Sequence, residues 1–471
     1  MKILLIEPDY KNKYPPLGLM KISSFHKQKG DEVVFYKGCN SDLRNINWDR
    51  IYISTLFTFH WTKTINTIQY YLKSVDNTRK IFIGGVLATL MKEHFEELFD
   101  ITVVQGLLNE PGKLRLTDDG IIDSLLPDYS IIDPTTNSIL DYKYQTDDCY
   151  IAYATRGCIR KCSFCAVPII EPIFSNSLSI KAQVEAIKIN FGEKKHLLLM
   201  DNNILASKCF PEIIEEIKSL GFTRGATLEY IKNGRKQKIN RYVDFNQGVD
   251  ARLLNNNNIK LLSEIAIRPL RIAFDHVEQK DIYIEKVRLA AEHRIKTLSN
   301  YILFNYEDTP KDFYERLRIN IDLNEEFIKR GLITQIWSFP MKYSPVLGEF
   351  AFDRKFVGKH WNKKYLRAIQ CILLATHGVV GPKKSFFERA FGKDFKEFKK
   401  LLLLPEDYII FREKFESIDA PKKLQKKLDS LSTDERKIMF EIINNNSFRN
   451  CNINNGSKNF YKIVSIYTPT K

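Results

Sequence analysis

The sequence predicts a mixed α/β protein in three parts: a doubly wound parallel sheet, a second series of alternating strands and helices, and a helical C-terminal region. Three observations support this prediction. The 471 residues exceed the length of one ordinary domain, so two or three domains are expected. Short apolar runs alternate with amphipathic stretches in the first two parts of the chain, whereas the last part has helical periodicity only.

Residues 1–110 contain five short apolar runs separated by segments with helical periodicity. The expected strands are Lys2–Ile6, Asp31–Tyr36, Ile51–Leu56, Lys80–Ile83 and Ile101–Val104, and the expected helices are Pro15–Lys29, Thr62–Ser74 and Ala88–Phe99. Strands joined by helices pair in parallel, which predicts a doubly wound, Rossmann-like sheet. Ligands of such sheets bind at the carboxyl ends of the strands. Residues 111–148 are polar and rich in turn signals, so we expect a connector there.

The alternation resumes at Cys149 with a longer period and continues to residue 345. The expected strands are Tyr150–Ala154, His196–Met200, Tyr242–Asn246, Leu270–Ala273, Lys296–Phe304 and Thr334–Phe339, and the expected helices are Ile180–Phe191, Phe210–Leu220, Asn257–Ile265, Ile282–His293 and Pro310–Arg330. Such a series predicts six β/α units, with functional residues expected at the carboxyl ends of the strands. Gly221–Arg241 is a polar, basic insertion before the third strand and is expected to form a flap.

Residues 346–471 are expected to be mainly helical and are strongly basic. Helical patterns cover Lys364–Thr376, Ser385–Leu403 and Pro421–Asn444. From Ala351 onward, 25 lysines and arginines face 13 acidic residues, a net +12 of the chain's +15. This excess allows a nucleic-acid partner, while the alternative is a Lys- and Asn-rich composition with solvated side chains. An aromatic stripe from Phe386 to Phe398 is expected to be core.

Composition excludes several classes of protein. No apolar run approaches the ~20 residues that span a bilayer. The N-terminal apolar run meets Glu7 and Pro8 after only a few residues, which indicates a buried strand and not a signal peptide. Eight cysteines are too few for a disulfide scaffold of this length. We therefore expect a cytoplasmic protein without a membrane partner.

Cys158, Cys162 and Cys165 form a C-x3-C-x2-C motif directly after the first strand of the second series. Three thiolates can hold three irons of a four-iron cluster and leave the fourth iron without a protein ligand. A zinc site is an alternative, but no fourth ligand lies at a usual spacing. Three buried thiols are another alternative, but the basic neighbours Arg156, Arg160 and Lys161 favour thiolates. The motif therefore predicts an iron–sulfur cluster.

This motif, with Phe164 before its last cysteine, resembles that of radical S-adenosylmethionine (SAM) enzymes. The resemblance implies a [4Fe–4S] cluster on Cys158, Cys162 and Cys165, with SAM bound at the open iron and Phe164 near its adenine. It further implies reductive cleavage of SAM to a 5′-deoxyadenosyl radical, an external reductant such as flavodoxin or ferredoxin, and a partial TIM-like barrel.

In that family, groups at the strand ends hold SAM. By position, the implied SAM-binding residues are Met200 (through its backbone), Asp201, Gln247, Asp250, Arg252, Asp275 and Asn305. The residues themselves allow other roles: Asp201 could form a turn, Arg252 and Asp250 a local ion pair, and Asp275 a helix N-cap. The family's Gly-x-Pro-x-Glu turn is changed in this chain, where Asn305 stands in its place.

The first 110 residues resemble the cobalamin-binding domain that precedes many radical SAM barrels. The candidate residues are Leu17, Gly18, Gly84, Gly85, Gly106 and His60. The D-x-H-x-x-G motif that supplies a histidine ligand to cobalt is absent. Two alternatives follow: a cobalamin-dependent methyltransferase, or a vestigial domain.

Taken together, these features predict a radical SAM enzyme of unknown substrate, whose catalytic residues the sequence does not name. The alternative is a nucleic-acid-binding iron–sulfur protein with a structural cluster, in which the basic C-terminal region binds the nucleic acid.

Overall fold

A computed structural model describes residues 1–116, 118–176, 179–232, 235–450 and 456–468. The chain forms two compact units: the first contains Met1–Leu270 and Ser344–Phe356, and the second contains Arg271–Tyr343 and Val357–Lys471. Both units mix helices and strands, as expected. The predicted domain boundaries at residues 110, 148 and 345 stay a prediction. The two units are defined by their internal packing, and each of them contains more than one sheet or group of helices. No helix of the described part combines the length and the apolar character needed to cross a membrane.

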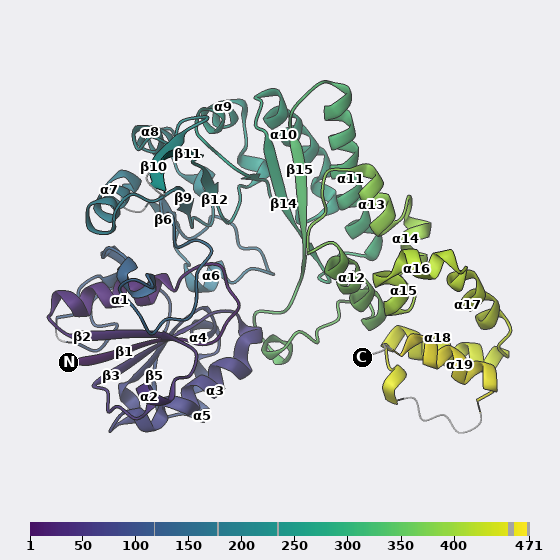
Figure 1. Cartoon of the computed structure of the whole chain (residues 1–471), viewed down its shortest axis with the longest axis horizontal. Helices are drawn as coiled ribbons and strands as arrows, with labels where there is room; N and C mark the ends of the chain where they lie inside the picture. The colour runs from purple at the N-terminus through teal and green to yellow at the C-terminus, as the bar shows by residue number, and fades with distance from the viewer. Residues whose placement is uncertain (117, 177–178, 233–234, 451–455, 469–471) are drawn as a thin grey trace. The chain divides into compact units, whose positions relative to one another are not determined.

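Five parallel strands form the first sheet of the first unit (Figure 1). They are β1 (Lys2–Glu7), β2 (Glu32–Lys37), β3 (Arg50–Thr55), β4 (Ile81–Gly85) and β5 (Thr102–Val104), in the order β2-β1-β3-β4-β5. The helices of this part are α1 (Leu17–Gln28), α2 (Ser41–Arg44), α3 (Trp61–Tyr71), α4 (Val86–Leu90) and α5 (Lys92–Leu98). All five predicted strands and their parallel pairing are confirmed, while the predicted helix Ala88–Phe99 is interrupted at Met91, whose φ of −125° and ψ of 33° are not helical.

Both faces of this sheet are buried. Ile3 to Ile6 have no exposed surface, because alternate side chains face different layers of helices. Leu4 and Ile6 join a core with residues of α3, α4 and α5, and α1 lies on the other side of the sheet (Figure 1). Ala351 also lies in this core, with Val346 and Phe352 packed against it, so the segment Ser344–Phe356 completes the first unit.

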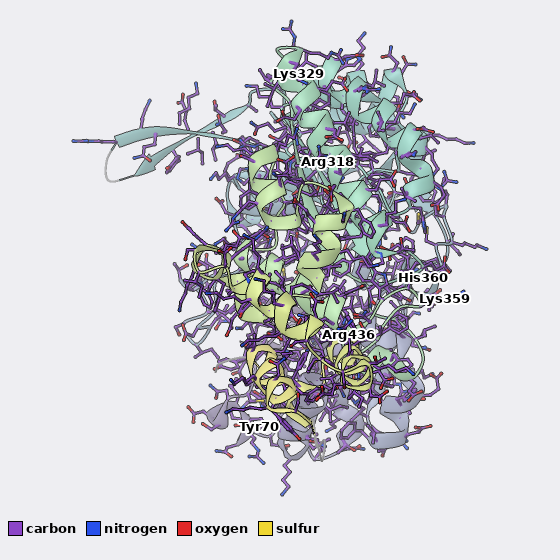
Figure 2. All side chains as sticks on the ribbon, turned by 90° about the vertical axis from the view of Figure 1, so that its right-hand side faces the viewer. Tyr70, Arg318, Lys329, Lys359, His360 and Arg436 are labelled. Carbon is purple, nitrogen blue, oxygen red and sulfur yellow. The ribbon has the colours of Figure 1, made fainter. Side chains whose placement is uncertain are left out.

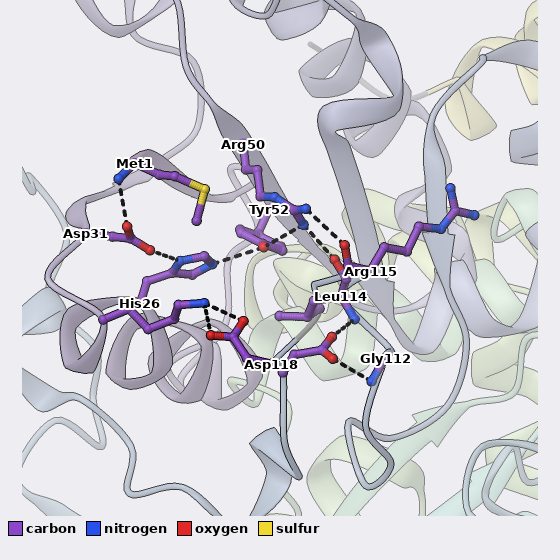
Figure 3. Close-up of polar contacts among 11 residues, drawn as sticks. Met1, His26, Asp31, Arg50, Tyr52, Gly112, Leu114, Arg115 and Asp118 are labelled. Carbon is purple, nitrogen blue, oxygen red and sulfur yellow. Dashed lines mark hydrogen bonds and ion pairs between the residues drawn. The ribbon is translucent and has the colours of Figure 1, made fainter.

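The predicted connector packs against the first sheet. His26 of α1 is fully buried, contacts Asp31 through Nδ1 at 2.6 Å, and contacts the Tyr52 hydroxyl through Nε2 at 3.0 Å (Figure 3). The guanidinium of Arg50 donates to the backbone oxygens of Leu114 at 2.6 Å and Arg115 at 3.2 Å. The amino end of β3 is therefore tied to the connector.

A second, three-stranded parallel sheet of the first unit has the order β12-β9-β6. Its strands are β6 (Cys149–Ala152), β9 (His196–Leu199) and β12 (Val243–Phe245), and its helices are α6 (Val167–Ile170), α7 (Ile180–Phe191), α8 (Phe210–Ser219) and α9 (Asn256–Glu264). A short pair, β7 (Thr155–Arg156) with β8 (Ser175–Asn176), follows β6. The predicted flap is an antiparallel hairpin of β10 (Thr227–Lys232) and β11 (Arg235–Asn240), and Figure 2 shows it projecting from its unit.

The second unit contains a three-stranded sheet in the order β13-β14-β15, in which β14 and β15 pair in parallel, followed by helices. Its elements are β13 (Leu270–Arg271, at the border of the units), α10 (Lys280–Glu292), β14 (Thr297–Phe304), α11 (Pro310–Lys329), β15 (Gln335–Lys342), α12 (Lys363–Ala375), α13 (Lys384–Phe391), α14 (Phe395–Leu402), α15 (Glu406–Ile410), α16 (Arg412–Ser417), α17 (Ala420–Asp429), α18 (Thr433–Asn445) and α19 (Lys458–Tyr467). Six strands thus occur where a six-stranded barrel is predicted, but in two sheets of three, so the barrel stays a prediction.

The C-terminal region is helical, as predicted, and the expected helix Lys364–Thr376 is α12, whereas the expected helix Pro421–Asn444 is divided into α17 and α18. The expected helix Ser385–Leu403 is divided at Gly392 into α13 and α14. Phe387, Phe391 and Phe398 have no exposed surface, which confirms that the aromatic stripe contributes to the core, whereas Phe386 is exposed.

Candidate functional site

The three cysteines lie on a loop that begins at the carboxyl end of β6 and ends at α6. Cys158, Cys162 and Cys165 are all partly exposed. The loop starts at Gly157, whose φ is +73°, and a Cβ atom there would collide with the Ile173 carbonyl and lie 3.0 Å from the backbone oxygen of Glu171. Only glycine fits this position without strain. Gly157 therefore allows the sharp turn at which the cysteine loop begins.

Two hydrogen-bond donors face the sulfur of Cys158. Its Sγ accepts from the backbone N–H of Arg160 at 3.3 Å and from Nδ2 of Asn203 at 3.6 Å. Asn203 is 3% exposed, and its Oδ1 has no hydrogen-bond partner among the described residues. Donors to sulfur stabilise a thiolate and tune an iron–sulfur cluster, so this environment fits a cluster ligand.

The three sulfurs do not form a ready-made metal cage. Within the described residues, no three His, Cys, Asp or Glu side chains come close enough together to hold a metal ion. Metal binding and local folding are coupled in many proteins, and the ligands of such sites gather as the metal binds. The donor set and the hydrogen bonds to Cys158 fit a cluster, and the binding of one stays a proposal.

Glu171 secures the start of the cysteine loop. Its Oε2 accepts from the Gly157 backbone N–H at 2.6 Å and from Nδ2 of Asn202 at 3.0 Å. Glu171 also faces the guanidinium of Arg156 at 3.6 Å, and Arg156 pairs with Asp123 at 3.0 Å. One carboxylate thus connects the loop entry to the residues that follow β9.

Asp201, predicted to contact SAM, is buried and bonded to the chain itself. Its carboxylate accepts from the Ala154 N–H at 3.0 and 3.1 Å, from the Thr155 N–H, and from the Thr155 hydroxyl at 2.7 Å. Asp201 is 3% exposed, and this burial raises the pKa of its carboxyl to about 6 despite the hydrogen bonds. The carboxylate holds the turn between β6 and β7, so it positions the cysteine loop.

Asp250 connects the cysteine loop to the end of β12. Its Oδ2 lies 2.8 Å from Nε of Arg160, and its Oδ1 lies 2.7 Å from Nε of Arg252. Burial opposes ionisation of Asp250, but the hydrogen bonds from Arg252 and Arg160 lower its pKa overall. The local Arg252–Asp250 pair that the sequence allows is therefore present, and the contact to Arg160 joins residues 90 positions apart.

The other predicted SAM-binding residues of the first unit range from exposed to hydrogen-bonded within the chain. Gln247 is exposed and Phe164 is half-buried. The Met200 backbone N–H donates to the Ala152 oxygen at 3.0 Å, and its Sδ accepts from Nδ2 of Asn246 at 3.7 Å. The structure thus brings Met200, Asp201 and Asp250 to the strand ends that border the cysteine loop.

Asp275 and Asn305 belong to the second unit. Asn305 is fully buried, with a φ of +71°. Its Oδ1 accepts from the Gly358 N–H at 2.7 Å, and its Nδ2 donates to the Tyr343 oxygen at 3.2 Å. The backbone oxygen of Asp275 accepts from the guanidinium of Arg316 at 2.8 Å. These contacts hold strand ends together, and the role of both residues toward SAM stays a prediction.

His60 and Gly85, predicted for cobalamin, each contact neighbouring parts of the first sheet. His60 stacks on Tyr10 with ring centroids 4.7 Å apart, and burial lowers its pKa to about 4. Gly85 has a φ of +106°, and a Cβ atom there would collide with the backbone of Thr55 on β3. Gly84 precedes it in β4. The close approach of two strands accounts for this glycine without a ligand.

The other three residues predicted for cobalamin are Leu17, Gly18 and Gly106. None of their contacts with the rest of the chain indicates a ligand. Leu17 packs against the cluster of Cys149, Ile151 and Leu198, and Gly18 is an exposed residue of α1. The Gly106 N–H donates to Oγ1 of Thr89 at 3.0 Å. These contacts do not form a cofactor cradle, and the binding of cobalamin stays a prediction.

Sequence reasoning missed two residues of this site, Glu171 and Asn203. Neither belongs to the cysteine motif, although Asn203 ends the polar run Asp201–Asn203 that follows β9. That run is a signal, because several polar residues at a buried strand end need partners. No protein-family model and no curated protein matches this chain, so the resemblance of its cysteine motif stays an expectation.

Proposed function

We propose that this protein is a radical SAM enzyme that binds a [4Fe–4S] cluster through Cys158, Cys162 and Cys165. The observation that carries the proposal is the C-x3-C-x2-C loop at the carboxyl end of β6, next to the polar ends of β9 and β12. When bound, the cluster supplies one electron for reductive cleavage of SAM. The substrate is unknown, and the reaction after cleavage is left open.

The chain's own residues would set the position and the electrostatics of the loop. Glu171 and Asp201 fix the backbone on its N-terminal side, and Asp250 holds the Arg160 side chain. Asn203 donates to the Cys158 sulfur. Donors aimed at a cluster sulfur stabilise its reduced, more negative state. We assign these four residues to positioning, and none of them to catalysis.

The proposal implies partners and a setting. The electron comes from a small protein reductant such as flavodoxin or ferredoxin. The thiolates need a reducing compartment, which favours the cytoplasm. Met200, Gln247 and Arg252 are proposed to border the SAM, together with Phe164.

Anaerobic reconstitution with iron and sulfide, followed by dithionite and SAM, tests the proposal. We expect an absorbance band near about 400 nm and formation of 5′-deoxyadenosine. Replacing Cys158, Cys162 and Cys165 by Ala should abolish both. Replacing the exposed Cys39 and Cys209 by Ala serves as the matched control and should leave both unchanged.

The outcomes separate the candidates. A stable band without any 5′-deoxyadenosine would contradict the enzyme proposal and favour a structural cluster in a nucleic-acid-binding protein. A band that survives the triple substitution would show that the ligand assignment is wrong.

A further inference from the structure

The hairpin of β10 and β11 is an isolated two-stranded ribbon. The two strands pair with each other from Thr227↔Asn240 to Lys232↔Arg235, and they belong to no other sheet of the described chain. Figure 2 shows both strands extending clear of the elements at their base. A hairpin of this kind is marginally stable alone and buries little apolar surface, so it contributes little to the core. Its projection needs another explanation.

The base of the ribbon is firmly attached. The Arg241 guanidinium lies 2.7 Å from Glu193 and 4.0 Å from the centroid of the Phe222 ring, and it donates to the Lys194 oxygen at 3.0 Å. The Arg224 N–H donates to the Glu264 oxygen at 2.8 Å. Since its root is fixed, the ribbon is presented in one direction, which lowers the entropy lost when a partner binds.

The exposed side chains of the ribbon are mainly cationic. Arg235, Lys236 and Lys238 are exposed on β11. Lys238 lies 4.0 Å from Glu229 across the ribbon, with both side chains about two-thirds exposed, which makes this a weak ion pair. In the described part of the chain, no carboxylate lies within ion-pair distance of Arg235 or Lys236. Two or three positive charges are therefore available to an anionic partner.

An aromatic ring, that of Tyr230, lies on the same face of the ribbon as Arg235. The Tyr230 hydroxyl donates to Oε1 of Gln237 on the opposite strand at 2.7 Å, so the ring is held in place across the ribbon. Strand alternation puts Tyr230, Gln237 and Arg235 on one face, with Leu228 and Ile239 nearer the base, and puts Lys236 and Lys238 on the opposite face. A half-buried ring on the same face as an arginine offers a surface on which a base can stack.

We propose that this ribbon binds single-stranded nucleic acid, with Tyr230 against a base, Arg235 on a neighbouring phosphate, and Lys236 and Lys238 on phosphates that pass the opposite face. The mixture of exposed cations and one aromatic ring is typical of surfaces that bind single strands, whose base faces are free to stack on the ring. An acidic protein could pair with the positive charges, but it would offer no base to stack on the Tyr230 ring. The proposal does not depend on SAM chemistry, because it concerns an element remote in sequence from the cysteine loop.

Fluorescence anisotropy with the full-length protein tests the proposal. The probes are a labelled 30-nucleotide single-stranded RNA, the corresponding DNA strand and its duplex, each titrated at several salt concentrations. The triple variant R235Q/K236Q/K238Q should bind about 10- to 100-fold more weakly, with the salt slope reduced by about 2. The Tyr230→Leu variant should weaken binding of single strands about tenfold without changing the salt slope. The RNA and DNA arms identify which strand is preferred.

The matched control removes the same charge from the basic C-terminal region. The variant K422Q/K423Q/K426Q alters three exposed lysines of α17. Its affinity should stay within about twofold of the unaltered protein, with circular dichroism verifying the fold of each variant. The proposal is wrong if the unaltered protein binds no probe at low salt, or if ribbon and control variants lose affinity equally. It is also wrong if polyglutamate binds the ribbon as tightly as RNA, an outcome that favours an acidic protein partner.

Discussion

The buried carboxyl of Asp201 makes a specific prediction about the pH dependence of stability. Burial raises its pKa from 3.8 to about 6 in the folded protein. The folded state then binds more protons than the unfolded state between these values, so stability decreases as pH rises through this window. The full shift corresponds to about 3 kcal/mol, and about 2 kcal/mol of it develops between pH 4.5 and 7.5.

The Asp201→Asn variant removes this titration while keeping the shape of the side chain. Its amide oxygen can still accept from Thr155, and the protonated carboxyl that it replaces has similar hydrogen-bonding capacity. From pH 4.5 to 7.5, the unaltered protein should therefore lose about 2 kcal/mol of unfolding free energy relative to the variant.

Urea unfolding at several pH values measures this difference, and hydrogen exchange of the β6–β7 peptides localises it. The control is Asp141→Asn, at an exposed aspartate of the same unit, which should follow the unaltered protein at every pH. Parallel pH profiles for the unaltered protein and Asp201→Asn would refute the reasoning. A gain of stability for the unaltered protein relative to Asp201→Asn with rising pH would also refute it, since it would mean that the hydrogen bonds outweigh burial.

Three further substitutions test the surroundings of the site. Gly157→Ala should destabilise the protein by about 1–3 kcal/mol, because the φ of residue 157 is +73° and an added Cβ atom would collide with a carbonyl. Unfolding curves measure the loss of stability, and iron content after reconstitution measures the effect on the cysteine loop. An unchanged unfolding free energy together with an unchanged iron content would contradict the prediction. Asp250→Asn should weaken the ion pairs of residue 250 with Arg160 and Arg252 and speed hydrogen exchange in the loop that carries the cysteines. Equal exchange rates in the variant and the unaltered protein would argue against a role of Asp250 in holding this loop. His26→Phe should remove a loss of stability between pH 7.5 and 5.5: burial lowers the pKa of His26, so protonating this side chain costs stability as pH falls below about 6.5. Equal changes in melting temperature between these pH values for the unaltered protein and the variant would exclude this role.

The strands of the first sheet could be predicted from sequence because each is a short apolar run with turn residues on both sides. Their ends agree with the structure to within a residue or two, for example Ile101–Val104 against Thr102–Val104. Parallel pairing follows from the helices between them. Helix ends were less predictable: Met91 interrupts one helix with a local backbone conformation that periodicity does not encode.

The positions of candidate site residues could be predicted, but their contacts could not. Polar residues at strand ends mark an edge of a sheet, which identified Asp201 and Asp250. Whether such a carboxylate faces a ligand or the chain depends on distant residues, such as Arg160 for Asp250, that only the folded structure brings together. Glu171 lies outside every motif, and its role depends on the tight turn at Gly157.

The segment Ser344–Phe356 has a consequence for how the protein is made. The chain leaves the first unit after Leu270 and returns to it about 70 residues later, where Ala351 enters its core. Domains generally fold as the ribosome releases them, at about 5–20 residues per second. The first unit therefore has to wait for the β-strands of the second to be synthesised before its core is complete. Expression of the cysteine loop as an independent fragment requires this returning segment, which a linear cut at residue 270 would discard.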